Sequence, residues 1–253
     1  MTRESRKMKN RYLVPLAEGG DGPPMFIVPS AGATFFSFVT LAQTLSAPGP
    51  IYSYSLTELE VSDSKHLTLE DIAEVLLEEL RAVRPHGPYY LGGHCWGGVV
   101  ALHMASCLEA AGEDVKGVFL MESFVPVAIG GHRAASPSAG ATFKATMDEI
   151  REQTLRDAGA KLARMPKKHA DRLLELTANQ IETGNVYDPA TLETSLRLFR
   201  TDTHDDVAFR GWDSLCSGSF SVQSVPGDTN SMLEKPHVDT LCRELEAFIK
   251  ACV

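Results

Sequence analysis

The chain lacks the cysteine spacing that indicates a disulfide framework or a zinc site. It has five cysteines, an odd number, and no Cys-x-x-Cys pair. Without paired spacing we expect no disulfide bond and no metal ion, and we expect a reducing, cytoplasmic setting. The five residues are Cys95, Cys107, Cys216, Cys242 and Cys252.

Long apolar runs and a positive charge balance are also missing. No apolar run is long enough to span a membrane. The basic start, Thr2 to Arg11, lacks the apolar core of a secretory signal, and we interpret it as a frayed terminus or an interdomain linker remnant. The formal net charge of −9 argues against nucleic acid as the main partner. We therefore expect a protein that binds neither a membrane nor nucleic acid.

The composition is that of an ordinary globular domain. A length of 253 residues, with 43% hydrophobic and 23% charged residues, fits a single domain over residues 1–253. Apolar runs that predict strands alternate with segments of helical period. The alternation predicts an α/β fold with a mostly parallel sheet and helices on both faces. We expect strands at 25–28, 51–55, 89–91, 115–121, 195–199 and 220–225, and helices at 35–45, 68–84, 96–112 and from 236 onward.

Residues 89–105 predict a strand, a sharp turn and a helix. Within the turn, Gly93-x-Cys95-x-Gly97 has the form of a nucleophile elbow, with Cys where Ser is usual. The N–H groups that begin the helix would point at the Cys95 side chain, so we expect a lowered pKa for this thiol. The alternative is a glycine-rich turn that contains a buried cysteine.

A long insert interrupts the alternation between the strands at 115–121 and 195–199. The stretch 129–142 is rich in Gly, Ala and Ser and predicts a loop, whereas 143–185 predicts amphipathic helix. An insert over the carboxyl ends of the strands would form a lid. We therefore expect a helical lid insertion at about residues 127–190.

These features resemble the thioesterase domains of the α/β-hydrolase fold that end nonribosomal peptide and polyketide assembly lines. The resemblance runs from about Leu13 to the C-terminus. It rests on the oxyanion-loop stretch 26–33, the elbow 92–98, the strand-end acid Glu122, and the tail from Trp212 to Val238. It implies the α/β-hydrolase fold, a substrate delivered on the phosphopantetheine of an acyl or peptidyl carrier protein, and no other cofactor.

The sequence departs from the family pattern at three positions. Cys95 replaces the usual Ser, and Glu122 stands where the family usually has Asp. Thr229 occupies the position of the family's catalytic His, and the following Ser231-Met232-Leu233 fixes this register. A smaller departure is Pro29-Ser30, where the oxyanion loop usually reads His-Pro.

The cysteine at position 95 and the missing histidine at position 229 are chemically consistent with each other. A serine nucleophile that loses its histidine base loses on the order of 10⁶ in turnover. A thiol is a few per cent thiolate even at neutral pH and depends less on a base. The product of attack on a pantetheine thioester would be a Cys95 thioester that keeps its transfer potential. This favours acyl transfer or cyclisation over hydrolysis.

Other residues complete the expected site. The oxyanion hole would use the backbone N–H groups of Ala31 and Trp96. His204, after the strand at 195–199, is a candidate base, and the alternative is a solvated loop histidine. Its acid partner would be Glu122, Asp202, Asp205 or Asp206. Glu122 either orients such a base or is a leftover acid, and the other histidines are interpreted as structural, loop or surface residues.

The insert also carries an excess of positive charge in an acidic chain. Residues 144–172 contain 8 basic and 5 acidic side chains. The carrier proteins that the resemblance implies are acidic, so this segment is a candidate docking surface. The alternative is an ordinary charged helix face.

We expect an enzyme of natural-product biosynthesis, a thioesterase-like acyltransferase or cyclase. It would take an acyl or peptidyl group onto Cys95 and pass it to a nucleophile under the lid. The first alternative is an editing or releasing thioester hydrolase with His204 as base. The second is a catalytically retired module that only binds a carrier.

Overall fold

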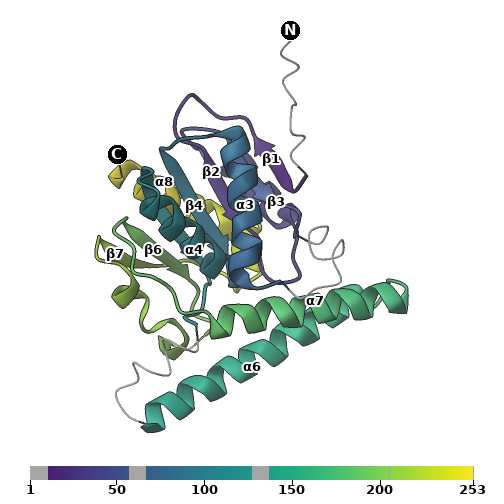
Figure 1. Cartoon of the computed structure of the whole chain (residues 1–253). Helices are drawn as coiled ribbons and strands as arrows, with labels where there is room; N and C mark the ends of the chain where they lie inside the picture. Colours follow the sequence, from purple (N-terminus) through teal and green to yellow (C-terminus); the bar gives the residue numbers. More distant parts are fainter. Residues whose placement is uncertain (1–10, 57–66, 127–136, 205, 253) are drawn as a thin grey trace.

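The chain forms one seven-stranded sheet with helices on both faces (Figure 1). The computed structural model describes residues 11–56, 67–126, 137–204 and 206–252. The sheet order is β1-β3-β2-β4-β5-β6-β7, and only β1 runs antiparallel to its neighbour. The mostly parallel α/β fold predicted from the sequence is therefore confirmed. The strands are β1 (Leu13–Ala17), β2 (Met25–Val28), β3 (Ile51–Tyr54), β4 (Tyr89–His94), β5 (Val115–Met121), β6 (Leu196–Arg200) and β7 (Phe220–Ser224).

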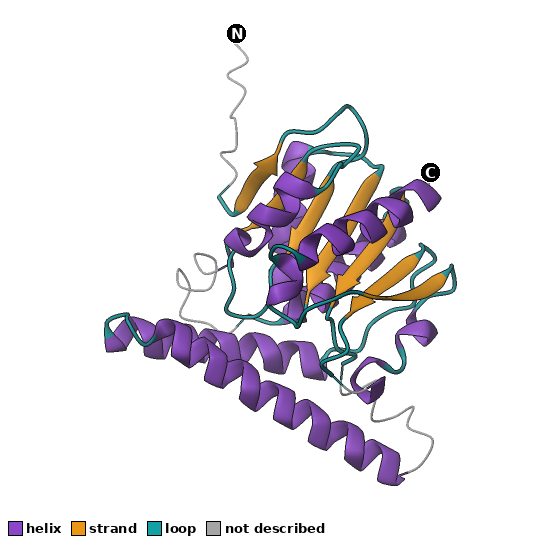
Figure 2. Cartoon of the chain, turned by 180° about the vertical axis from the view of Figure 1, so that it is seen from behind, coloured by secondary structure: helices purple, strands orange, loops and turns teal. Residues whose placement is uncertain are grey.

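Two pairs of helices cover the two faces of the sheet (Figures 1 and 2). α3 (Leu69–Val83) and α4 (Trp96–Ala110) share one apolar core with one face. α1 (Val39–Thr44) and α8 (His237–Ala251) share a second core with the other face. The central strands are buried on both sides, which explains why β2 and residues 118–121 of β5 read as continuous apolar runs. Short 3₁₀ turns lie at Phe35–Phe38, Asp206–Phe209, Trp212–Leu215 and Ser231–Leu233.

α3 begins and ends where its sequence signals predict. The Thr68 hydroxyl accepts a hydrogen bond from the Asp71 N–H, and the Asp71 carboxylate accepts one from the Thr68 N–H. This reciprocal capping box satisfies two N–H groups that a helix start would otherwise leave unpaired. The helix ends at Val83, two residues before Pro85.

The edge strand β1 was missed by the sequence analysis. It contains Pro15 and has a mixed burial pattern, both of which weaken a strand signal. Proline is tolerated there because β1 is an edge strand, with a partner on one side only. The pairing of β1 with β3 shifts register between Pro15 and Ala17.

The insert between β5 and β6 forms two long helices, α6 (Pro137–Leu162) and α7 (Lys167–Val186). They pack against each other and extend past the end of the sheet (Figure 1). The loop predicted at 129–142 was wrong for 137–142, which are helical, because Pro137 begins the helix and outweighs the Gly and Ser content. Residues 129–136 lie outside the described part of the chain. Across the described residues, no helix has the length and apolar content to cross a bilayer.

Candidate active site

Cys95 lies in a strained turn between β4 and α4. Its backbone has φ 52° and ψ −122°, a region that non-glycine residues seldom adopt. Glu122, directly after β5, has φ 47°, and these two are the non-glycine residues with positive φ in the described ranges. Such backbones cost on the order of 1–3 kcal/mol each and cluster at functional sites. The strain therefore marks two residues that the sequence analysis names separately as site candidates, Cys95 as the nucleophile and Glu122 as the strand-end acid.

Glycines make the sharp turn at Cys95 sterically possible. A Cβ on Gly93 would lie 2.1 Å from the Gly97 carbonyl oxygen, and a Cβ on Gly97 would lie 2.3 Å from that of Val28. Both distances are far below van der Waals contact, so any larger residue would force strand and helix apart. The glycines thus bring the start of α4 against the end of β2.

The site lies where the strand order reverses. β4 and β3 flank β2 on opposite sides, and ligands bind at such switch points, at the carboxyl ends of the strands. The Cys95 thiol is hydrogen-bonded by the Ser30 side chain, from the loop after β2, and by the Trp96 N–H. No hydrogen bond occupies the Ala31 N–H within the described residues. Of the two N–H groups predicted for the oxyanion hole, that of Ala31 lies on the loop after β2 and that of Trp96 lies at the first residue of α4.

The prediction of a lowered thiol pKa at Cys95 was wrong. Cys95 is only 8% exposed, and burial raises the pKa of its thiol above the ordinary value. The hydrogen bonds from Ser30 and Trp96 lower the pKa, but by less than burial raises it, and the nearby Glu122 raises it further. Desolvation of the thiolate therefore outweighs the N-terminus of α4. A base that removes the thiol proton becomes more important than the sequence analysis assumed.

Glu122, Thr229 and His204 form a hydrogen-bonded chain. The Thr229 hydroxyl donates to Glu122 Oε2 over 3.3 Å, and its Oγ1 lies 3.2 Å from His204 Nε2. Because the single hydroxyl hydrogen goes to Glu122, Thr229 accepts from His204 Nε2–H. This arrangement leaves His204 Nδ1 without a proton and able to accept one. Position 229, where the family has its histidine, here holds a threonine whose hydroxyl links the Glu122 carboxylate to the His204 imidazole.

Burial shifts the pKa of both titratable groups in this hydrogen-bonded series, Glu122 and His204. Glu122 is fully buried, which raises its pKa, while hydrogen bonds from Thr201 and Thr229 lower it. Burial also lowers the pKa of His204, and the Arg200 charge lowers it further. The imidazole is therefore neutral at pH 7, the form in which it can act as a base. The Phe124 and His204 rings pack at nearly right angles, with their centroids 5.1 Å apart.

Among the acids considered for His204, the structure brings Glu122 to it. His204 Nε2 lies 3.9 Å from Glu122 Oε2. Asp202 instead accepts a hydrogen bond from Ser224, and Asp206 pairs with Arg200. Asp205 lies outside the described residues.

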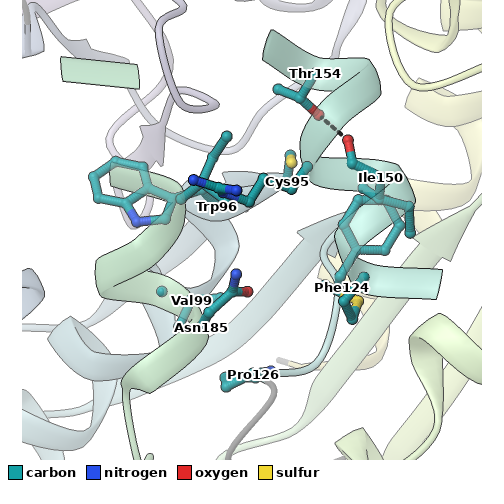
Figure 3. A pocket seen from close by; sticks show the side chains of 12 residues that line it. Cys95, Trp96, Val99, Phe124, Pro126, Ile150, Thr154 and Asn185 are labelled. Atoms are coloured by element: carbon teal, nitrogen blue, oxygen red, sulfur yellow. Dashed lines mark hydrogen bonds between the residues drawn. The ribbon is translucent and has the colours of Figure 1, made fainter. Parts of the chain in front are cut away.

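Cys95 and His204 line the same cavity of about 710 Å³. Residues of the loop after β2, of the tail loop after β7 and of α6 complete its wall. A second, smaller cavity of about 40 Å³ adjoins Cys95 between α4, α6 and α7. Figure 3 shows this smaller cavity, with Trp96 and Asn185 on one side and Phe124 and Ile150 on the other.

Several contacts at the site had no signal in the sequence. The Gly32 N–H donates to Gln180 Oε1 of α7 over 2.8 Å, and the Trp96 indole donates to Thr183 over 3.3 Å. The buried His94 donates from Nε2 to the Thr229 carbonyl over 2.7 Å, and its pKa is lowered to about 4 by burial. The Gly32–Gln180 contact joins residues 148 positions apart, so only the fold reveals it.

The described residues hold no group of three or more His, Cys, Asp or Glu able to bind a metal ion.

Sequence comparison identifies relatives among peptide synthetases. The family described as "Thioesterase domain" matches residues 23–249. A dimodular nonribosomal peptide synthase of Bacillus subtilis (strain 168) is 27% identical over 231 residues, which are 82% of this chain and 10% of that protein. Malpinin synthetase of Mortierella alpina is 34% identical over 111 residues, 44% of this chain and 1% of the synthetase. The chain thus spans a tenth or less of these curated relatives.

Solved structures show the same fold. The Vlm2 thioesterase domain bound with a dodecadepsipeptide has a TM-score of 0.70 and 25% identity, covering 93% of this chain and 96% of that one. The NocB thioesterase domain from the nocardicin cluster has a TM-score of 0.74 and 24% identity, covering 94% and 99%. With a family match over most of its length and an elbow at the expected place, this chain belongs to the thioesterase-domain family of the α/β-hydrolase fold.

Proposed function

We propose that this chain transfers or cyclises acyl or peptidyl groups through a thioester on Cys95, in nonribosomal peptide or polyketide biosynthesis. The substrate arrives on the phosphopantetheine of a carrier protein. The observation that carries this proposal is the strained Cys95 elbow, which opens into the 710 Å³ cavity beside His204. The peptide synthetases among the relatives support the same substrate class.

The first step forms the Cys95 thioester. His204 Nδ1 accepts the thiol proton, and the Cys95 sulfur attacks the carbonyl carbon of the carrier thioester. The Ala31 and Trp96 N–H groups stabilise the resulting oxyanion. The carbon–sulfur bond to pantetheine then breaks, and the departing thiolate takes the proton from His204. Glu122, through Thr229, stabilises the imidazolium while it carries this proton.

The second step passes the acyl group to an acceptor. An amine, hydroxyl or thiol attacks the Cys95 thioester, gives its proton to His204, and releases the Cys95 sulfur, which takes the proton back. Exchange of one thioester for another is close to isoenergetic, so the acyl group keeps its transfer potential on Cys95. An acceptor within the same acyl chain gives a ring, and an external acceptor gives transfer.

A second candidate function is hydrolytic editing or release. It is favoured by one observation: hydrogen bonds through Thr229 link His204 to Glu122, an arrangement that suits a base that deprotonates water. Burial lowers the pKa of His204, which favours the neutral imidazole. The chemistry on Cys95 is the same, with water as the acceptor. The two candidates therefore differ only in what attacks the acyl-enzyme.

Intact-protein mass spectrometry after exposure to acyl- and aminoacyl-pantetheine thioesters tests the proposal. We expect an adduct on the wild type and on the matched control Cys216→Ala, whose thiol lies away from the cavity, but none on Cys95→Ala. Decay of the adduct that is faster with added amine or thiol than in water alone supports transfer. The hydrolase is identified if the Cys95 adduct decays in water at a rate that added amine or thiol does not change, and if this decay is lost in His204→Ala.

Carrier binding without an adduct on Cys95 and without thioester turnover would overturn the catalytic proposal. The remaining function would be that of a retired carrier-binding module.

A further inference from the structure

Arg151, on the inner side of α6, has a buried donor that nothing in the described chain satisfies. Its Nε is inaccessible to solvent and has no hydrogen-bond partner. Arg151 also forms no ion pair within the described residues, although Glu152 on the same helix pairs with Arg156. A buried donor without an acceptor is unfavourable, and more so on a charged group. The unsatisfied position therefore calls for an acceptor from beyond the described residues.

This arginine lines the smaller cavity beside the nucleophile. The cavity is bounded by Cys95 and Trp96 at one end and by residues of α6 and α7 at the other. Phe124, Ile150 and Val99 make its wall mostly apolar (Figure 3). Asn185, from α7, adds an amide to the wall. A group attached to a Cys95 thioester would enter an apolar space that contains one cation.

We propose that this cavity binds a carboxylate at the distal end of the acyl group, with Arg151 as its partner. The inference deepens the proposed function and rests on it. The substrate class would be short acyl or aminoacyl groups with an acidic end, such as dicarboxylic half-thioesters. A guanidinium binds a carboxylate through parallel hydrogen bonds and neutralises it at the same time. A neutral carbonyl would satisfy Nε but would leave the charge uncompensated.

The size of the cavity agrees with this class. A volume of about 40 Å³ accommodates about three water-sized groups. That is close to the size of a carboxylate with its attached methylene. The phosphate of phosphopantetheine is a less suitable occupant, because it lies at the far end of the arm from the thioester. The arm itself fits the larger cavity, where Lys161 and Asn230 form a polar wall.

Three pantetheine thioesters of equal chain length test the inference: succinyl, succinamyl and butanoyl. The measurement is the rate of adduct formation on Cys95. We expect the wild type to prefer succinyl over the other two by about 10- to 100-fold, the range for a charge-assisted hydrogen bond. Arg151→Gln should reduce that ratio to near one, and Arg151→Lys should retain part of it. The control Arg156→Gln, on the same helix but exposed and outside the cavity, should keep the wild-type ratio.

Binding to the Cys95→Ala protein separates this inference from the proposed function. Isothermal titration with succinyl- and butanoyl-pantetheine should show the same preference without any chemistry, and Arg151→Gln should abolish it. Equal affinity for the two ligands in Cys95→Ala would overturn the carboxylate site even if Cys95 is acylated. A preference in binding without any adduct on the wild type would instead overturn the proposed catalysis and leave the carboxylate site standing.

Discussion

Thr229 has a role in this site that its residue type does not suggest. In the family, this position carries the catalytic imidazole. Here its hydroxyl lies between Glu122 and His204, so that the imidazole comes from the loop after β6. The hydroxyl lets the buried carboxylate act on His204 across a 3.9 Å gap. A carboxylate, an imidazole and a thiol are thus all present, and the imidazole comes from a different position in the chain than in the family pattern.

Replacing Thr229 tests this link. Thr229→Val keeps the shape but removes the hydroxyl, and we expect Cys95 acylation to slow about 10- to 100-fold, because charge-assisted hydrogen bonds contribute about 1.5–3 kcal/mol. The loss also destabilises the imidazolium, so the already lowered pKa of His204 falls further. Acylation is lost as pH falls through that pKa, so the acid limb of the pH–rate profile moves to lower pH.

Thr229→Ser is the matched control, because it restores the hydroxyl. It should recover most of the rate and the wild-type pH profile. If Thr229→Val matches the wild type in both rate and pH profile, then Thr229 is a packing residue and His204 acts without Glu122.

At the scale of elements, the helix α7 holds the oxyanion loop. Gln180, only 4% exposed, accepts a hydrogen bond from the Gly32 N–H. Thr177 packs so closely against Gly32 that a Cβ there would lie 2.3 Å from the Thr177 hydroxyl oxygen, and the φ of 68° at Gly32 would strain any other residue. The Gly32 N–H is therefore engaged, whereas the neighbouring Ala31 N–H, the proposed oxyanion donor, has no acceptor among the described residues. Any displacement of α7 moves the loop that supplies this donor.

Gln180→Leu tests the coupling between helix and loop. It leaves a buried N–H unpaired, so we expect the free energy of unfolding to fall by about 1–3 kcal/mol, a drop in Tm of several degrees for a chain of this size. Cys95 acylation should fall more than about 10-fold, because a displaced oxyanion donor costs about that much or more. The exposed Gln43 of α1 provides the control Gln43→Leu, which should change neither quantity. A stability loss with an unchanged acylation rate would refute the coupling.

Local sequence signals predicted some elements and not others. The Thr68–Asp71 box and the glycine elbow act within a few residues, so α3, β4 and α4 were predictable. β1 was not, because Pro15 is compatible with an edge strand only when the partner strand is known. In the site, Glu122 and His204 were candidates because both follow strands of one sheet. The thiol pKa of Cys95 was beyond prediction, because it depends on how deeply α6, α7 and the loops bury the sulfur.

At the scale of the whole molecule, the paired helices α6 and α7 extend beyond the sheet (Figure 1). The tip where they join is cationic. The tip comprises Arg164, Lys167 and Lys168, all exposed and outside the ion pairs of the described residues, around the exposed Met165. The chain as a whole carries −9, so this concentration of positive charge is local. An acidic carrier protein would be drawn to this end of the molecule and repelled by most of the rest.

Charge reversal at the tip tests carrier docking without altering the chemistry. Lys167→Glu with Lys168→Glu should raise KM for a carrier-bound thioester about 10-fold or more at low salt, since rim charges act mainly on association. The same variant should leave the reaction with free pantetheine thioesters unchanged. Acidic residues suit the first turn of α7, so the variant should fold.

The double variant Arg243→Glu with Lys250→Glu, on α8, is the matched control. It makes the same change in net charge elsewhere and should have little effect on KM. Equal effects of the two double variants would show that net charge alone, and not a docking surface at the tip, governs the encounter with the carrier.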